Sequence, residues 1–506
     1  MKQTLRPRFA RPMSILLCLA CLPQAMAEEA GLAEPRESWS VITMAKTRIG
    51  YSRSRLAQEK RGEQIVWKTS AETHLNIKRF GQELKLQHRQ ETVESEDGGL
   101  LEISFEMQNP PASSTYSKGK VVGDELKIKT TILGVETEKT LKWDPEVKSP
   151  AYQDRYLLEH PLESGKSMKF KAFSPEYNKY FTISLKGKGE ALIKNHAGVK
   201  VPARRIDVTQ SLTPGVVMAV YLDDKSETIK SRTTMLGTDM EVFNVSREEA
   251  LREVESGEID LGLETLVKVP MPDDPHLVGQ IRYRMTGEEI DVRDRIPTGD
   301  TQEAKEAREG SVEILVRAVR PTTAGVTPES EPGEEFLTSS RYLQSDDPDV
   351  RRHAEAAVGS ERDPWKQAVK MEKYVQEKLT SKNFSTAMAS AAEVAKSLEG
   401  DCTEHACLLA AMARVKKIPS RVVVGLVYAR SLEAFGGHMW TEVFIKDRWI
   451  PLDATLGLGG IGAGHIKLSD SSFSDDAPTP GASFLSLLDL LGRIQLEVLD
   501  VEAGNP

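Results

Sequence analysis

The chain has 506 residues and a formal net charge of −9 at pH 7, with 39% hydrophobic and 28% charged residues. This length and composition predict a globular, multidomain protein with ample core, because one core rarely serves so long a chain. The acidic balance argues against a nucleic-acid partner. After the first 27 residues no stretch is long and apolar enough for a transmembrane helix.

The first 27 residues have the pattern of a secretory signal peptide. An apolar run at residues 13–22 is followed by Ala25-Met26-Ala27, a cleavage site of the A-x-A type. The basic residues before this run are Lys2, Arg6, Arg8 and Arg11. We therefore predict export to the periplasm or the exterior. Cleavage of the signal peptide would remove these four positive charges and change the formal net charge from −9 to −13.

The cysteines fall into two pairs. Lipidation at Cys21 is the weaker alternative to simple cleavage, because Cys18 occupies a place where lipoprotein signals usually have leucine. Cys402 and Cys407 remain in the mature chain and would point roughly 140° apart on a helix, which is a poor geometry for a disulfide. A free thiol kept in an oxidising compartment favours chemistry at Cys402, whereas Cys407 fits a buried core position.

Residues 38–245 are dense in strand signals. Apolar and polar residues alternate over 101–108, and the same period of two recurs in several later segments. This pattern predicts a large antiparallel, curved sheet with one apolar face. Such a sheet could hold a lipid, a peptide or a cell-envelope partner, but a scaffold closed by its own core is the simpler interpretation.

Shorter units follow this β-rich region. Ser246 and Glu249 form a capping-box pattern that predicts a short helix. A small β module is expected over residues 262–320, with strands near 280–285 and 312–319. Residues 321–337 have linker composition, and the last domain is placed at 338–506 with its core at 385–468.

The last domain begins with helical patterns. Asp363-Pro364 and Ser390 are expected to start two helices, and Trp365 falls in the apolar stripe of the first. Asp401 is a good N-cap for a buried helix over residues 402–415. A buried strand at 421–428, a hairpin of 438–445 with 449–453 and a strand at 466–468 should follow. The tail reads as an apolar helix at 484–491 and a strand at 494–498.

The hairpin gives a register that can be tested. If Lys446-Asp447 is a two-residue turn, Trp440 lies opposite Asp453, and His438 shares a face with Asp453 as a diagonal neighbour. Cys402 lies in the first turn of its helix, where the helix dipole favours a thiolate and unpaired amides can bind an oxyanion. Cys402 as nucleophile, His438 as base and Asp453 as orienting group form a generalised triad.

Two other assignments compete for these residues. His405, one turn after Cys402, is an alternative base, although nothing obvious orients it. A zinc site made of Cys402, His405, Cys407 and His438 is disfavoured by spacing, since Cys407 points away. No calcium loop of the D-x-D-x-D-G type is present, so we expect no metal and no cofactor.

The motifs G-D-C-x-E at Cys402, H-x-W-x-E-V at His438 and W-x-P-L-D-A-T at Asp453 resemble the transglutaminase-like superfamily, which is related in design to papain. This resemblance implies a C-terminal α+β papain-like domain behind a β-rich N-terminal region. It implies an acyl-transfer site with Cys402, His438 and Asp453 in the triad roles. In some relatives a tryptophan supplies an oxyanion donor, but the helical stripe around Trp365 favours packing.

The expected activity is attack of the Cys402 thiolate on a peptide or glutamine-type amide of a protein or peptide substrate. Water or an amine then resolves the thioester, and both outcomes remain open. The alternative is a non-enzymatic cell-envelope binding protein in which the papain-like domain is only a scaffold. An inert Cys402 would favour that alternative.

Overall fold

The structure is a computed structural model, and it describes residues 32–108, 114–132, 135–160, 162–175, 179–213, 215–253, 259–271, 274–288, 290–307, 310–323, 329–382, 388–475, 487 and 490–502. The predicted signal peptide, with Cys21, lies outside these residues. No helix of the described residues has both the length and the apolarity to cross a membrane.

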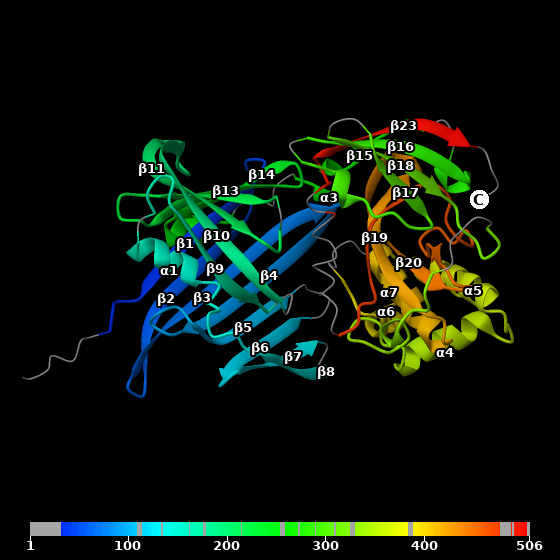
Figure 1. Ribbon diagram of the computed structural model, residues 1–506, viewed down its shortest axis with the longest axis horizontal. Helices are drawn as coiled ribbons and strands as arrows, with labels where there is room; N and C mark the ends of the chain where they lie inside the picture. Colours follow the sequence, from blue (N-terminus) through cyan, green and yellow to red (C-terminus); the bar gives the residue numbers. More distant parts are fainter. Residues whose placement is uncertain are drawn as a thin grey trace, which may run out of the picture.

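The N-terminal region is one antiparallel sheet of 14 strands, as predicted (Figure 1). The strands lie in the order β8-β7-β6-β5-β4-β3-β2-β1-β14-β13-β12-β11-β10-β9. Their bounds are β1 Arg36–Met44, β2 Thr47–Arg61, β3 Gln64–Arg79, β4 Gln82–Glu94, β5 Leu100–Gln108, β6 Thr115–Val122, β7 Glu125–Ile132, β8 Val135–Lys142, β9 Ser167–Ser174, β10 Lys179–Lys194, β11 Lys200–Gln210, β12 Val217–Leu222, β13 Thr228–Met235 and β14 Thr238–Val245.

The sheet curls so that its two edges approach each other. Lys148, after β8, donates its N–H to the Lys171 carbonyl of β9 at 2.8 Å, and the Tyr180 hydroxyl donates to the Lys142 carbonyl at 2.6 Å. Helix α1 (Tyr152–Glu159) packs its Leu157 into an apolar cluster with side chains of β9 to β12. The alternation of apolar and polar residues thus produces a sheet with a buried face, as expected for period-two strands.

Two short helices lead out of the sheet. Ser246 caps α2 (Arg247–Leu251) by accepting the Glu249 N–H at 3.2 Å, which confirms the predicted helix start. Asp260 caps α3 (Leu261–Glu264) in the same way. Short 3-10 turns occur at Pro275–Leu277, Arg293–Arg295, Glu334–Phe336 and Arg430–Leu432.

Two smaller antiparallel sheets follow. In the first, of order β17-β18-β16-β23, the last strand of the chain pairs with β16. In the second, of order β15-β20-β19-β22, strand β21 pairs with β20. The bounds are β15 Val267–Lys268, β16 Gln280–Gly287, β17 Gln302–Glu306, β18 Ser311–Arg317, β19 Ser420–Ala429, β20 Ala434–Phe444, β21 Trp449–Leu452, β22 His465–Ser471 and β23 Ile494–Glu502.

Among the described residues, the C-terminal region also includes the helices α4 (Pro348–Val358), α5 (Pro364–Lys378), α6 (Ala391–Ser397) and α7 (Cys402–Val415). The N-caps predicted for the last three are present at Asp363, Ser390 and Asp401. One apolar cluster joins side chains of α4 to α7 with those of both smaller sheets. The domain boundaries expected at residues 262, 321 and 338 fall in a region that shares this one core, and they stay predictions.

The predicted hairpin and tail can be compared with the structure. Lys446 and Asp447 both have positive φ, at 53° and 59°, which is the turn that joins two strands with right-handed twist. Thr441 pairs with Leu452 and Phe444 with Trp449, so the predicted register is confirmed. Strand β23 confirms the final strand, whereas the helix predicted at 484–491 lies largely outside the described residues.

Candidate active site

Cys402 is the first residue of α7, a helix that is buried on nearly all sides. The Asp401 side chain accepts the Thr403 N–H at 2.9 Å, and Glu404 returns the bond by accepting the Asp401 N–H at 2.9 Å. This capping box fixes where the helix starts, and therefore where the thiol lies. Cys402 is partly exposed, whereas Cys407 is fully buried, as predicted for Cys407.

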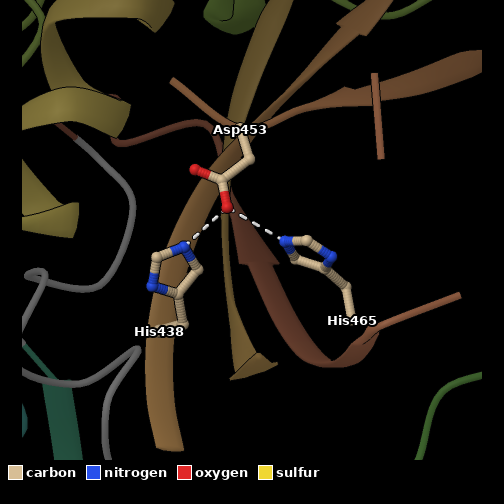
Figure 2. Close-up of side chains that lie close together, drawn as sticks. All are labelled: His438, Asp453 and His465. Atoms are coloured by element: carbon tan, nitrogen blue, oxygen red, sulfur yellow. Dashed lines mark hydrogen bonds and ion pairs between the residues drawn. The ribbon is translucent and has the colours of Figure 1, made fainter. Parts of the chain in front are cut away.

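Strand β20 brings His438 to this helix end. The Thr441 hydroxyl donates to the Ala406 carbonyl of α7 at 2.9 Å, which holds β20 against the first turns of the helix. His438 Nε2 lies 2.8 Å from Asp453 Oδ2 (Figure 2). The predicted diagonal pair across the hairpin is therefore formed, and it is almost completely buried.

Asp453 is a carboxylate with every lone-pair direction used. Its Oδ2 accepts from His438 and from His465 at 3.0 Å, and its Oδ1 accepts from the Thr455 N–H at 2.8 Å and hydroxyl at 2.6 Å. Burial alone would raise the pKa of Asp453, but these donors and the histidine charges outweigh it and hold that pKa well below its usual value. The group is thus an anion in the interior of the protein.

The environment of His438 favours its charged form. Burial lowers the pKa of His438, but the charges of Asp453 and of the Cys402 thiolate, with hydrogen bonds to both, raise it to about 10. His438 Nε2 faces Asp453 (Figure 2), so Nδ1 is the nitrogen left for Cys402. The three predicted residues are therefore brought together as a thiol, an imidazole and a carboxylate in sequence.

His465 is a site residue that the sequence analysis missed. It opens β22, is fully buried, and places Nε2 on the same Asp453 oxygen as His438 (Figure 2). Its ring lies 5.1 Å from that of Trp440 and 6.0 Å from that of His438. His465 therefore fixes the carboxylate from the side opposite His438.

Glu372 and Thr455 also hold the loop that carries Asp453. Glu372, on α5, accepts the Asp453 N–H at 2.9 Å and the Gly459 N–H at 2.7 Å. Burial raises the pKa of Glu372 to about 7, against the effect of these bonds. Thr455 could have been found from the sequence, because it belongs to the W-x-P-L-D-A-T motif. Glu372 lies in no motif, and its one sequence signal is an acidic residue within the apolar stripe of a helix.

The competing residues take other positions. His405 Nδ1 lies 2.6 Å from the Asp401 carbonyl, and burial lowers the pKa of His405. Trp365 lines a pocket with Lys416 and Pro419, which follow the C-terminal end of α7. A helix of this length spans roughly 20 Å, so Trp365 lies far from Cys402 and packs as the stripe predicted.

A metal ion is the other chemistry that this cluster could hold. Ligand atoms of His438, Asp453 and His465 lie within 4.8 Å of one another. Two imidazoles and a carboxylate are common transition-metal ligands. Both imidazole nitrogens point at one carboxylate oxygen at hydrogen-bond distance, however, which is the arrangement of two N–H donors on one acceptor.

His465 should make the fold acid-sensitive. Burial, partly opposed by Asp453, lowers its pKa to about 4, whereas an unfolded histidine titrates near about 6.5. Between these values only the unfolded chain gains the proton, so stability falls as the pH drops from 6.5 to 4, by about 3 kcal/mol. We expect His465→Gln to reduce the fall in Tm between pH 7 and pH 4.5.

The matched control is His160→Gln, at the exposed end of α1. This variant should keep the full acid-induced fall in Tm. An equal fall in the His465→Gln variant and in the unmodified chain would contradict the assignment of the acid sensitivity to His465.

Comparisons with known proteins agree with the C-terminal motifs. Residues 351–454, about a fifth of the chain, match the transglutaminase-like superfamily. No curated protein matches the chain. Among solved structures, the "Putative Cysteine Protease" from Cytophaga hutchinsonii is similar at 17% identity and a TM-score of 0.28, over 45% of this chain and 91% of that chain.

Two further solved structures are similar to larger or other parts of the chain. A "Putative Protease" from Parabacteroides distasonis has 12% identity and a TM-score of 0.19, over 68% of this chain and 64% of that chain. A beta-barrel-like protein from Brucella abortus, a domain of unknown function, has 11% identity and a TM-score of 0.30, over 42% of this chain and 96% of that chain.

Proposed function

Residues 351–454 form a transglutaminase-like superfamily domain, and on this premise we propose that the protein is a thiol-dependent acyl-transfer enzyme acting on peptide or glutamine-type amides. Cys402 is the nucleophile, His438 the proton carrier and Asp453 the group that orients His438. The observation that carries the proposal is the buried His438–Asp453 pair, 2.8 Å apart, beside a partly exposed cysteine at a helix N-terminus.

Acylation follows from the charges of this pair. The Cys402 thiolate attacks the amide carbonyl carbon, and the carbonyl electrons move to oxygen. When the tetrahedral adduct collapses, the C–N bond breaks and His438 gives its proton to the departing amine or ammonia. Asp453 stays ionised throughout, because its two oxygens keep their hydrogen-bond donors.

Deacylation reverses the proton transfer. Neutral His438 takes a proton from water or from a primary amine, which attacks the thioester carbon. The C–S bond then breaks and the thiolate returns beside a protonated imidazole. Water gives a carboxylic acid, so the enzyme is a peptidase or amidase, and an amine gives a new amide, so it is a transglutaminase.

The oxyanion has a donor at the start of α7. The Thr403 N–H is used by Asp401 and the His405 N–H by the Asp401 carbonyl. No hydrogen bond of the described residues uses the Cys402 N–H. This amide is adjacent to the nucleophile, and the helix dipole adds to its effect on a developing negative charge.

Mass spectrometry of a glutamine-rich protein, such as casein, tests this proposal after incubation with the enzyme and a biotin-labelled primary amine. Cys402-dependent amine adducts would establish transglutaminase chemistry, and Cys402-dependent cleavage would establish a protease. If neither adducts nor cleavage products are found and Cys402 also resists mild alkylation near neutral pH, the thiol is unreactive and the proposal is wrong. The domain would then be a scaffold for a binding function of the β-rich region.

The protonated state of His438 predicts an unusual pH profile of thiol labelling. The imidazolium attracts anionic iodoacetate more than neutral iodoacetamide, so the ratio of the two alkylation rates reports its charge. This ratio should stay high below the pKa of His438 and fall severalfold as the pH rises through about 10. Rates are measured in the Cys407→Ala background, and a fall centred near pH 6.5 would contradict the ion pair.

We also propose that the protein acts outside the cytoplasm, on the basis of the signal-peptide pattern in residues 1–27. Its substrates would then be proteins or peptides of the cell envelope or the surroundings. A mass measurement of the mature N-terminus tests this predicted export. A chain that begins at unmodified Glu28 would exclude both retention of the signal peptide and lipidation at Cys21.

A further inference from the structure

The N-terminal sheet reaches the helix that carries Cys402. Strands β3 and β4 form a hairpin that runs toward the C-terminal region (Figure 1). Arg79, the last residue of β3, places Nη2 in hydrogen-bond contact with Asp401 Oδ2, across 322 positions of sequence. Asp401 directly precedes Cys402, so a side chain of the β-rich region lies beside the proposed nucleophile.

The tip of this hairpin is held in place by several contacts. The N–H groups of Phe80 and Gly81 donate to the Asp260 carboxylate at 2.8 and 2.6 Å. Gln82 Nε2 donates to the Lys382 carbonyl at 3.3 Å. A Cβ atom at Gly262 would come within 2.9 Å of the Phe80 ring, so the ring requires glycine there. These contacts fix the position of Arg79 at the end of β3.

Acidic groups surround the start of α7. The side chains of Asp401 and Glu404 are each about 1% exposed. Asp401 Oδ1 accepts from the Thr403 N–H and hydroxyl, both at 2.9 Å, which leaves Oδ2 for Arg79. Burial and the neighbouring Asp401 raise the pKa of Glu404. A buried carboxylate one residue from a thiol opposes thiolate formation unless a cation compensates it.

Arg79 is placed to supply that compensation. Burial lowers the pKa of Arg79, but the negative charges of Asp401, Cys402 and Glu404 outweigh this effect and raise it. The attraction is mutual, so a charge that stabilises the guanidinium is itself stabilised by it. Within the described residues, Arg79 is the one basic residue in ion-pair contact with Asp401.

We propose that Arg79 is a positioning residue of the active site, through which the N-terminal sheet neutralises Asp401 and favours the Cys402 thiolate. This inference rests on the proposed function, and it assigns the β-rich region a direct part in the chemistry of the C-terminal domain. The titratable and charged groups around Cys402 come from several elements. They are Arg79 on β3, the N-cap Asp401, Glu404, His405 and Cys407 on α7, and His438 on β20 with Asp453 behind it.

The test is the pH profile of iodoacetamide labelling at Cys402, in the full chain with Cys407→Ala. An opposite charge within about 4–6 Å of an acid moves its ionisation by about 1–3 pH units. Arg79→Met should therefore shift the labelling midpoint upward by about one unit and slow labelling about tenfold near pH 7. Arg79→Lys, which keeps the charge, should stay near the unmodified chain.

The matched control is Lys85→Gln, which removes a positive charge on β4, 3.6 Å from Glu83 and on the same hairpin. Its profile should overlay that of the unmodified chain. A folded Arg79→Met protein whose profile overlays that of Lys85→Gln would overturn the proposal. A purely structural role would lower Tm and leave the midpoint in place, so both are measured.

A double variant that removes both Arg79 and the Asp401 charge tests whether Arg79 acts by neutralising Asp401. Asn is also a good N-cap, so Asp401→Asn keeps the helix start while it removes the carboxylate. In the Arg79→Met background it should return the midpoint toward the original value, and alone it should lower the midpoint. If Arg79→Met does not fold, an unchanged or raised midpoint in Asp401→Asn overturns the proposal. A Cys402 that is inert in the unmodified chain would instead refute the proposed function.

Discussion

Replacement of Cys402 by alanine is expected to abolish covalent labelling at neutral pH and to reduce acyl transfer by about 10⁴-fold or more, because a triad enzyme without its nucleophile keeps only binding and oxyanion stabilisation. The fold should be unaffected, since Cys402 is partly exposed and its side chain makes no hydrogen bond that caps α7. The measurement combines intact-mass labelling by iodoacetamide with amine incorporation into casein.

Cys407→Ala is the matched control for this experiment. Cys407 lies five residues further along the same helix, is fully buried, and burial raises its pKa well above the usual cysteine value. It should therefore contribute no labelling in the native protein, and its alanine variant should keep full labelling and transfer. Equal labelling of the Cys402→Ala variant and the unmodified chain would show that the reactive thiol is not Cys402.

Replacement of Asp453 by asparagine should have the second-largest effect. The amide would place an N–H₂ group either against the two histidines or against Thr455, where the structure has only donors. His438 could instead accept a hydrogen bond from the new amide at Nε2. The imidazole proton would then lie on Nδ1, and no basic nitrogen would face Cys402. We expect transfer to fall by about 10⁴-fold, as when the orienting acid of a triad loses its charge.

The same substitution should destabilise the fold. A buried donor left facing donors costs about 1–3 kcal/mol, and the imidazolium of His438 loses its anion. Labelling of Cys402 near neutral pH should fall as well, because a thiolate beside a neutral imidazole is less favoured. Amine incorporation, iodoacetamide rates and urea unfolding measure the three effects.

Asp447→Asn is the control for this variant. Asp447 lies in the turn of the same hairpin, at a φ of 59°, where asparagine is well accommodated. It should preserve activity and stability. Full transfer activity in a folded Asp453→Asn protein would contradict the role of Asp453 and would leave His438 oriented by other contacts.

Local signals in the sequence predicted all three residues of the candidate triad. The Asp401 cap fixed the start of α7, and the two-residue turn at Lys446-Asp447 fixed the register of β20 and β21. In a hairpin the turn sets the pairing, so the parity of His438 and Asp453 follows from counting residues. The period of two likewise predicted the large antiparallel sheet at the N-terminus.

The groups that complete the site were decided by the tertiary structure. His465 opens a strand that pairs with β19 rather than with a hairpin neighbour, so no turn fixes which residue it faces. Glu372 reaches the Asp453 loop from α5. Strand β23 joins β16 from more than 200 residues away. Such pairings depend on the packing of a shared core, which sequence periodicity does not encode.

Arg79 is the clearest example of a site residue whose place depends on the tertiary structure. It ends β3 just before the turn at Phe80 and Gly81, and the sequence analysis did not single it out. The approach of this turn to Asp401 arises from contacts with Asp260 and Lys382, both distant in sequence. By itself the sequence therefore predicted where Cys402, His438 and Asp453 lie, because hydrogen bonds within a helix and a hairpin fix their geometry. Only the docking of the two regions decided which charges surround them.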